Sequence, residues 1–139
     1  MLYNFKQFNN RAVYLYPEIE TDDYFSTGSY QTIIEYFGEV IIQVCDSDYQ
    51  GDTRVLLKRN GQYGILIFGW GSCSGCDALQ ACSDIHSLNE LIDRLDNDIK
   101  WFDTVEQVKE YINSEDRELS YYWHEDEWES FKNQILGLE

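Results

Sequence analysis

Three of the four cysteines lie close together in a glycine-rich segment, and thiols at such spacing can bind a metal ion. Cys73, Cys76, Cys82 and His86 follow the spacing C-x2-C-x5-C-x3-H. Zinc is held by four thiolate or imidazole ligands placed tetrahedrally, and a turn containing glycine can direct two thiolates toward one ion. Most zinc motifs separate their two ligand pairs more widely, so zinc is an alternative interpretation of this segment and not the preferred one.

The same segment also permits a thiol-redox interpretation. Cys73-Ser74-Gly75-Cys76 is a C-x-x-C sequence before a possible helix start, where the helix dipole favours a thiolate. Thioredoxin-like motifs belong to a βαβ pattern, whereas a predicted β-hairpin precedes this one. A phosphate-binding loop is excluded, because the segment matches neither glycine-rich pattern and carries no Lys or Arg. We prefer a packing interpretation, in which the glycines form tight turns and the thiols pack as small apolar groups.

Two acidic segments resemble metal motifs but lack a required ligand. Asp46–Asp52 begins like a calcium loop, but the twelfth position is Leu57, where such loops carry a bidentate Glu. His124-Glu125 lacks the second histidine of the zinc-protease motif. With two histidines in the chain and no nucleophile beside a base, catalysis by a Ser or Cys triad has little support. We therefore predict a non-enzymatic protein without a cofactor.

Carboxylates dominate the charge of the chain: 26 acidic residues face 10 basic ones, for a net charge of −16. Such a surface repels nucleic acid and anionic membranes but attracts basic proteins. The alternative is that the acidity serves solubility alone. The candidate partner-binding residues form three clusters: Glu18, Glu20, Asp22 and Asp23; Glu115, Asp116 and Glu118; and Glu125, Asp126, Glu127 and Glu129.

Aromatic residues accompany two of these clusters. Tyr14 and Tyr16 precede the first, and Tyr121-Tyr122-Trp123 precedes the last. An exposed ring beside a carboxylate can receive an Arg or Lys side chain by stacking and ion pairing. The simpler interpretation, which must hold for most of the aromatic residues, is that they form the core.

The elements that position these groups mix strands with helices. Ala12–Tyr16, ended by Pro17, is typical of an edge strand. A short amphipathic helix is predicted from Tyr30 to Phe37, with Ser29 as cap and Gly38 as stop.

The central part of the chain has the clearest β signal. Val40–Cys45, Thr53–Arg59 and Tyr63–Phe68 are strand-like runs, and Asp46–Asp52 forms a polar turn between the first two. Asn60-Gly61 joins the last two runs and favours a type I′ hairpin, because both residues tolerate positive φ. These runs predict a three-stranded antiparallel meander, with a possible extra N-terminal edge strand.

Helices follow the meander. Ser87 with Glu90, and Thr104 with Gln107, have the spacing of capping boxes. Three apolar stripes follow: Leu88, Leu91, Ile92, Leu95 and Ile99; Val105, Val108, Tyr111 and Ile112; and Trp128, Phe131, Ile135 and Leu138. The fold class is therefore α+β, with the meander packed against several C-terminal helices in a single domain of residues 1–139. No run approaches a membrane span and no signal peptide is recognisable, so we expect a cytoplasmic protein.

The middle of the chain resembles a known family. The Tyr49–Thr53 run, the Arg54–Phe68 hairpin, Gly69–Cys82 and Ile99–Asp103 are similar to a family of small uncharacterised phage and bacterial proteins, and the string GWGSCSGCDAL is the specific part. The resemblance covers somewhat less than half of the chain. It implies a phage or prophage origin, and with it an inhibitor of a host defence complex, such as an anti-CRISPR protein.

The function we expect is that of an acidic binding protein. It would occupy a basic, nucleic-acid-binding surface of a host defence protein, such as a CRISPR nuclease, without binding nucleic acid or a membrane itself. The alternative is a small zinc-binding or thiol-redox protein centred on Cys73, Cys76, Cys82 and His86. A third possibility is an intracellular domain whose partner surface is not electrostatic.

Overall fold

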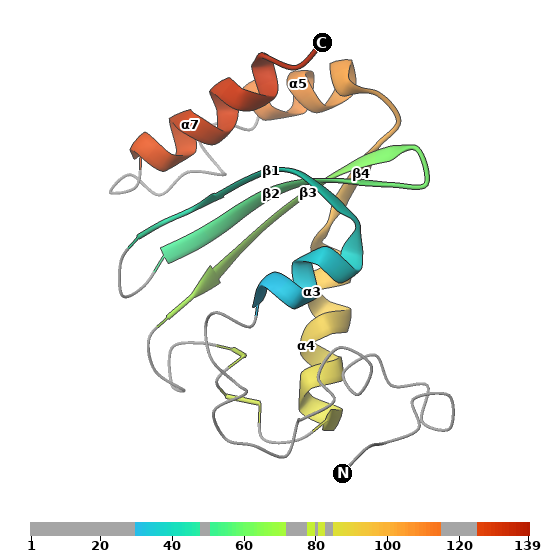
Figure 1. Ribbon diagram of the computed structural model, residues 1–139, viewed down its shortest axis with the longest axis vertical. Helices are drawn as coiled ribbons and strands as arrows, with labels where there is room; N and C mark the ends of the chain where they lie inside the picture. The colour runs from blue at the N-terminus through green and yellow to red at the C-terminus, as the bar shows by residue number, and fades with distance from the viewer. Residues whose placement is uncertain (1–29, 48–50, 72–77, 80, 83–84, 115–124) are drawn as a thin grey trace.

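The computed structural model describes residues 30–47, 51–71, 78–79, 81–82, 85–114 and 125–139. Within these residues an antiparallel four-stranded sheet in the order β1-β2-β3-β4 forms the centre of the molecule (Figure 1). The strands are β1 (Glu39–Cys45), β2 (Gly51–Arg59), β3 (Gln62–Trp70) and β4 (Lys100–Phe102). The predicted meander is confirmed, and β4 extends it by one strand. The predicted strand at Ala12–Tyr16 lies outside the described residues.

The hairpin between β2 and β3 forms where the sequence predicts it. Asn60 and Gly61 have φ angles of 54° and 80°, so both turn residues are left-handed, as a type I′ turn requires. The two strands then pair without interruption from Arg59↔Gln62 to Gly51↔Trp70. Strand β2 begins two residues before the predicted Thr53, so Asp52 lies in the strand and not in a polar turn.

Strand β4 was not predicted, because a three-residue strand gives no recognisable alternation. It pairs with Tyr63–Ile65 of β3. Gly64 permits this pairing: a Cβ there would stand 2.8 Å from the Trp101 ring and 2.7 Å from a methyl carbon of Ile99. The indole of Trp101 therefore lies across the glycine, where any side chain would displace it.

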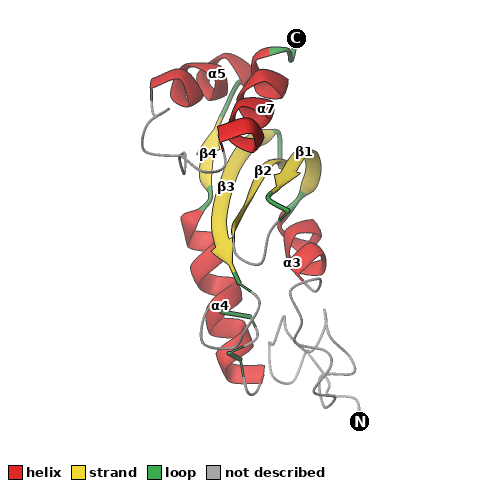
Figure 2. Cartoon of the chain, turned by 90° about the vertical axis from the view of Figure 1, so that its left-hand side faces the viewer, coloured by secondary structure: helices red, strands yellow, loops and turns green. Residues whose placement is uncertain are grey.

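Helices cover both faces of the sheet, as the two views show (Figures 1 and 2). The described helices are α3 (Tyr30–Phe37), α4 (Ile85–Asp98), α5 (Val105–Ser114) and α7 (Glu125–Leu136). Helices α3 and α4 pack on one face, and α5 and α7 pack on the other. None of the helices in the described ranges is long and apolar enough to cross a membrane.

Burial from two sides explains the continuous apolar run of β2. Val55, Leu56 and Leu57 are all fully buried. Val55 and Leu57 belong to the cluster with α3 and α4, whereas Leu56 belongs to the cluster with α5 and α7. A strand with one face in water would place a polar residue at every second position.

The two predicted capping boxes have different outcomes. Gln107 donates its backbone N–H to Thr104 Oγ1 at 3.2 Å and accepts the Thr104 backbone N–H at 3.3 Å, so this box is confirmed. The prediction for Ser87 and Glu90 is wrong, because α4 already begins at Ile85. Glu90 instead pairs with His86 one turn earlier. Sequence spacing cannot distinguish a cap from a position within the first turns of a helix.

Candidate functional site

The predicted zinc ligands that the structure describes have other partners. The Cys82 thiol is buried and donates to the Ala78 carbonyl oxygen at 3.3 Å. His86 Nε2 lies 2.8 Å from Glu90 Oε1 on the exposed side of α4. Cys73 and Cys76 lie outside the described residues, and within those residues no three His, Cys, Asp or Glu side chains are placed to hold a metal ion.

Asp46, at the start of the calcium-like segment, forms an internal ion pair with Arg54. Asp46 Oδ1 accepts a hydrogen bond from Arg54 Nη1 at 2.8 Å, and Asp46 Oδ2 accepts the Asp52 backbone N–H at 2.7 Å. Asp52 Oδ2 lies 3.9 Å from Arg54 Nη2. Both carboxylates are buried, so these acids hold the end of the β1–β2 hairpin and do not face solvent.

Arg54 is the least expected residue of the core. Its side chain is 0% exposed, and its cross-strand neighbours in the sheet are Val44 and Ile67. Its Nε and Nη2 atoms have no hydrogen-bond partner among the described residues. A buried guanidinium is stable only when a carboxylate compensates its charge, which is the role of Asp46.

Cys45, for which the sequence predicted no role, lines a small pocket of about 250 Å³. Its thiol is exposed and accepts hydrogen bonds from Thr53 Oγ1 and Gln43 Nε2, each at 3.5 Å. Trp70 Nε1 donates to the same Thr53 hydroxyl at 2.9 Å. These contacts bind the ends of β1, β2 and β3 together beside α3.

Of the three acidic clusters, the structure describes the one in α7. Glu125, Asp126 and Glu129 are exposed and Glu127 is half-buried. They occupy the start and outer side of the helix, because Trp128 and the other apolar residues of α7 point to the sheet. The clusters Glu18–Asp23 and Glu115–Glu118 lie outside the described residues.

Helix α5 packs beside α7 (Figure 2) and carries further exposed acids. Its Glu106 and Glu110 are exposed, whereas Val108 and Ile112 are buried against the sheet. The basic residues of these two helices, Lys109 and Lys132, are half-buried. Lys109 Nζ donates a hydrogen bond to the Leu138 carbonyl oxygen, so its ammonium group points toward the C-terminal residues.

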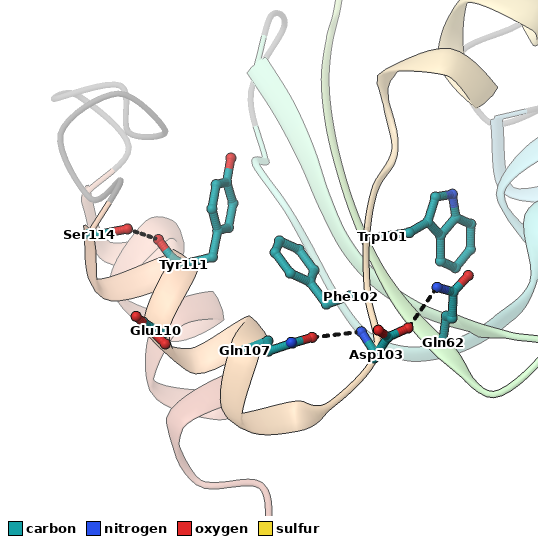
Figure 3. A pocket seen from close by; sticks show the side chains of 8 residues that line it. All are labelled: Gln62, Trp101, Phe102, Asp103, Gln107, Glu110, Tyr111 and Ser114. Atoms are coloured by element: carbon teal, nitrogen blue, oxygen red, sulfur yellow. Dashed lines mark hydrogen bonds between the residues drawn. The ribbon is translucent and has the colours of Figure 1, made fainter.

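A groove of about 560 Å³ lies between α5 and the edge of the sheet at β4 (Figure 3). The start of β3, strand β4, the residue after it and helix α5 provide its lining: Gln62, Trp101, Phe102, Asp103, Gln107, Glu110, Tyr111 and Ser114. We call it the β4 groove. Trp101 packs with the core on the α3–α4 face, and Phe102 with the core on the α5–α7 face. The β4 groove therefore follows the outer edge of the strand, with ring walls on both sides.

Hydrogen bonds hold the polar lining of the β4 groove in place. Gln107 Oε1 accepts the Asp103 backbone N–H at 2.8 Å, and Asp103 Oδ1 accepts a hydrogen bond from Gln62 Nε2 at 2.9 Å (Figure 3). Glu110 is exposed and has no hydrogen bond or ion pair with another described residue. The β4 groove thus offers one fixed carboxylate and one that is available to a partner.

The rings of the β4 groove already receive cations from this chain. Arg59 lies over Trp101, with Cζ 4.4 Å from the ring centroid, and Lys100 Nζ lies 5.7 Å from the Tyr111 centroid. Tyr111 also packs against Phe102 at a centroid distance of 5.1 Å. A ring face next to carboxylates is an attractive environment for a Lys or Arg side chain.

The sequence predicts acids beside aromatic residues at two other positions, Tyr14–Asp23 and Tyr121–Glu129. The signal for the β4 groove was Trp101-Phe102-Asp103 followed by Glu110-Tyr111 on the next predicted helix. This pattern predicted no site, because only the fold shows that α5 returns along the edge of β4.

Comparison with known proteins gives no relative from which a function can be transferred. No protein-family model, curated protein or solved structure matches the chain. The resemblance to small phage and bacterial proteins therefore stays a prediction, and the chemistry of the described residues is the basis for a functional proposal.

Proposed function

We propose that the protein is an acidic binding protein that docks onto a basic, nucleic-acid-binding surface of another protein. The observation that carries this proposal is the concentration of exposed carboxylates on the layer formed by α5 and α7. These residues, the acidic layer, are Glu106, Glu110, Glu125, Asp126 and Glu129. Glu110 lines the β4 groove, so one carboxylate of the acidic layer lies beside the aromatic surface of the groove.

The charge of the acidic layer favours this type of partner. Lys109 and Lys132, the basic residues of α5 and α7, are half-buried, so the exposed charge of the two helices is mainly negative. The net charge of −16 reinforces this local field. Complementary potentials accelerate encounter with a positive partner and repel phosphate groups, so competition with nucleic acid for one partner is the expected result.

Two finer predictions from the sequence remain separate. A phage-encoded inhibitor of a defence nuclease, such as a CRISPR effector, rests on the sequence resemblance alone. The zinc or redox alternative rests on Cys73 and Cys76, together with Cys82 and His86, whose described partners are an Ala78 carbonyl and Glu90.

The test of the proposed function begins with the tagged protein as bait in the native host, with the captured protein identified by mass spectrometry. Binding of that purified protein is then measured from about 50 mM to about 300 mM NaCl, a range in which screening of exposed charges increases strongly. We expect the association rate and the affinity to fall as salt rises. Duplex DNA should compete with the acidic protein for its partner.

A pair of charge-matched variants identifies the surface responsible. The first replaces the acidic layer by amides: Glu106→Gln, Glu110→Gln, Glu125→Gln, Asp126→Asn and Glu129→Gln. The control removes the same charge from other exposed positions: Glu35→Gln, Glu39→Gln, Glu90→Gln, Asp93→Asn and Asp98→Asn. The first variant should bind at least about tenfold more weakly than the control. Equal affinities, with no effect of salt or DNA, would contradict the proposal.

A further inference from the structure

Within the part of the chain that the structure describes, the outer edge of β4 is open to another strand. Strand β4 is the last in the sheet, and among the described residues no strand pairs with its outer side. Such an edge presents backbone N–H and C=O groups that an extended chain can bind. The opposite edge is less regular, because the pairing of β1 with β2 shifts between Val40 and Ile42. A bulge of this kind disfavours the addition of a strand.

The β4 groove provides space for an added strand at this edge. Its lining contains both Trp101 and Phe102, which lie on opposite faces of β4, together with α5 residues that face the strand (Figure 3). Three residues of extended chain span about 10 Å, which is the length of β4 itself. The groove has a volume of about 560 Å³ and is open to solvent, so an extended segment can enter it.

The charge and the aromatic rings of the groove indicate which side chains an added strand would carry. In an added strand, alternate side chains point to opposite faces of the sheet. A side chain on the α5 face meets the exposed Glu110, which suits Lys or Arg, next to the Tyr111 ring over which Lys100 already lies. A side chain on the other face meets the indole of Trp101, which suits an aliphatic residue.

We propose that the β4 groove binds an extended segment of the partner protein that adds as a strand to β4 and alternates cationic with aliphatic residues. A cationic side chain of this segment reaches Glu110 and Tyr111, while its backbone pairs with Trp101 or its neighbours. This inference rests on the proposed function, since it specifies how a basic partner is held. Main-chain pairing provides affinity, and the alternating side chains provide selectivity.

The probe for this site is the synthetic peptide acetyl-Arg-Val-Arg-Val-Arg-amide, titrated into the full-length ¹⁵N-labelled protein. We expect the largest NMR shift changes at the backbone amides of Trp101, Phe102 and Asp103. Three matched peptides separate the causes. One has Glu in place of each Arg. The other two keep every Arg but carry N-methyl groups that remove alternate backbone donors, along one edge in the second peptide and along the other edge in the third.

The N-methylated peptides are the decisive comparison. If the backbone pairs with β4, methylation of the facing edge should weaken binding at least about tenfold, and methylation of the other edge should have little effect. The Glu peptide should not bind. Replacement of the exposed Glu110 by Gln should weaken binding of the Arg peptide about threefold, whereas Glu35→Gln should leave it unchanged.

Three results would overturn the inference: equal binding of both N-methylated peptides, shift changes confined to α7, or no binding at millimolar peptide. These results leave the proposed function intact if the captured partner still responds to salt and to the acidic-layer variant. Conversely, the proposed function would be contradicted if binding of the captured partner changed neither with salt nor with the acidic-layer variant. This holds whether or not the peptide binds.

Discussion

Arg54 is fully buried in the core, although arginine side chains are mostly exposed in proteins. Its neighbours Val55 and Leu56 are fully buried, and the sheet continues on both sides of its strand. The guanidinium can stay inside because Asp46 reaches it at 2.8 Å from the end of the adjacent strand. Gly51 makes room for this carboxylate, since a Cβ there would lie 2.6 Å from the Asp46 Cβ.

The first prediction at this scale concerns the Asp46–Arg54 pair. Asp46→Asn should lower the free energy of unfolding by about 3–5 kcal/mol, because it leaves the Arg54 charge buried without its main partner. Urea unfolding followed by tryptophan fluorescence measures this change. The variant Arg54→Met combined with Asp46→Asn should lose less than the sum of the two single variants. Strictly additive losses would show that the two side chains are not coupled.

Turn and cap residues act locally, yet only part of these predictions is confirmed, since the predicted cap at Ser87 and Glu90 is wrong. Asn60-Gly61 adopts the predicted turn, and Thr104 with Gln107 caps α5 as predicted. The partners of Arg54 and of Cys82 were not predictable in this way. Each depends on a segment whose position is determined by the packing of other elements.

At the scale of elements, β4 connects the core to the candidate site. Its position depends on Gly64, over which the Trp101 ring lies. The same short segment continues into Asp103 and Thr104, which the cap of α5 holds in place. The edge of the sheet and the first turn of α5 are therefore joined by hydrogen bonds, and the β4 groove lies between them.

The prediction at this scale is that Gly64→Ala displaces β4. The added methyl group must push aside Trp101 or Ile99, so the free energy of unfolding should fall by about 1–3 kcal/mol. Gly137→Ala is the matched control, because its Cβ would stand 3.4 Å from the Asn133 carbonyl oxygen in ordinary contact. It should change stability by less than about 0.5 kcal/mol in the same urea titration. Equal effects would contradict the close packing of Trp101 on Gly64.

At the scale of the whole molecule, the net charge of −16 acts on stability as well as on binding. Like charges on a compact surface repel each other more than they do on an unfolded chain. The described ion pairs, such as Arg54–Asp46 and Arg59–Asp96, are few beside this excess. The fold is therefore stabilised chiefly by the two apolar cores, against an electrostatic cost.

The last prediction follows from this repulsion. The melting temperature should rise by several degrees between about 20 mM and about 300 mM NaCl, because salt screens the exposed carboxylates. The acidic-layer variant should start from a higher melting temperature and gain less from salt. Differential scanning calorimetry measures both quantities. A melting temperature indifferent to salt in both proteins would show that the carboxylates are too dispersed to destabilise the fold.

The α+β class, the hairpin at Asn60-Gly61 and the inner faces of the described helices could be predicted from the sequence. These properties follow from local conformational preference and from the period of the apolar residues. The coverage of both sheet faces by helices and the position of β4 at the sheet edge follow from tertiary packing. The same packing brings Tyr111 against Phe102 and places Glu110 in the lining of the same groove, because α5 returns along β4. Contacts between separate segments depend on how the elements pack, and no local pattern in the chain records that packing.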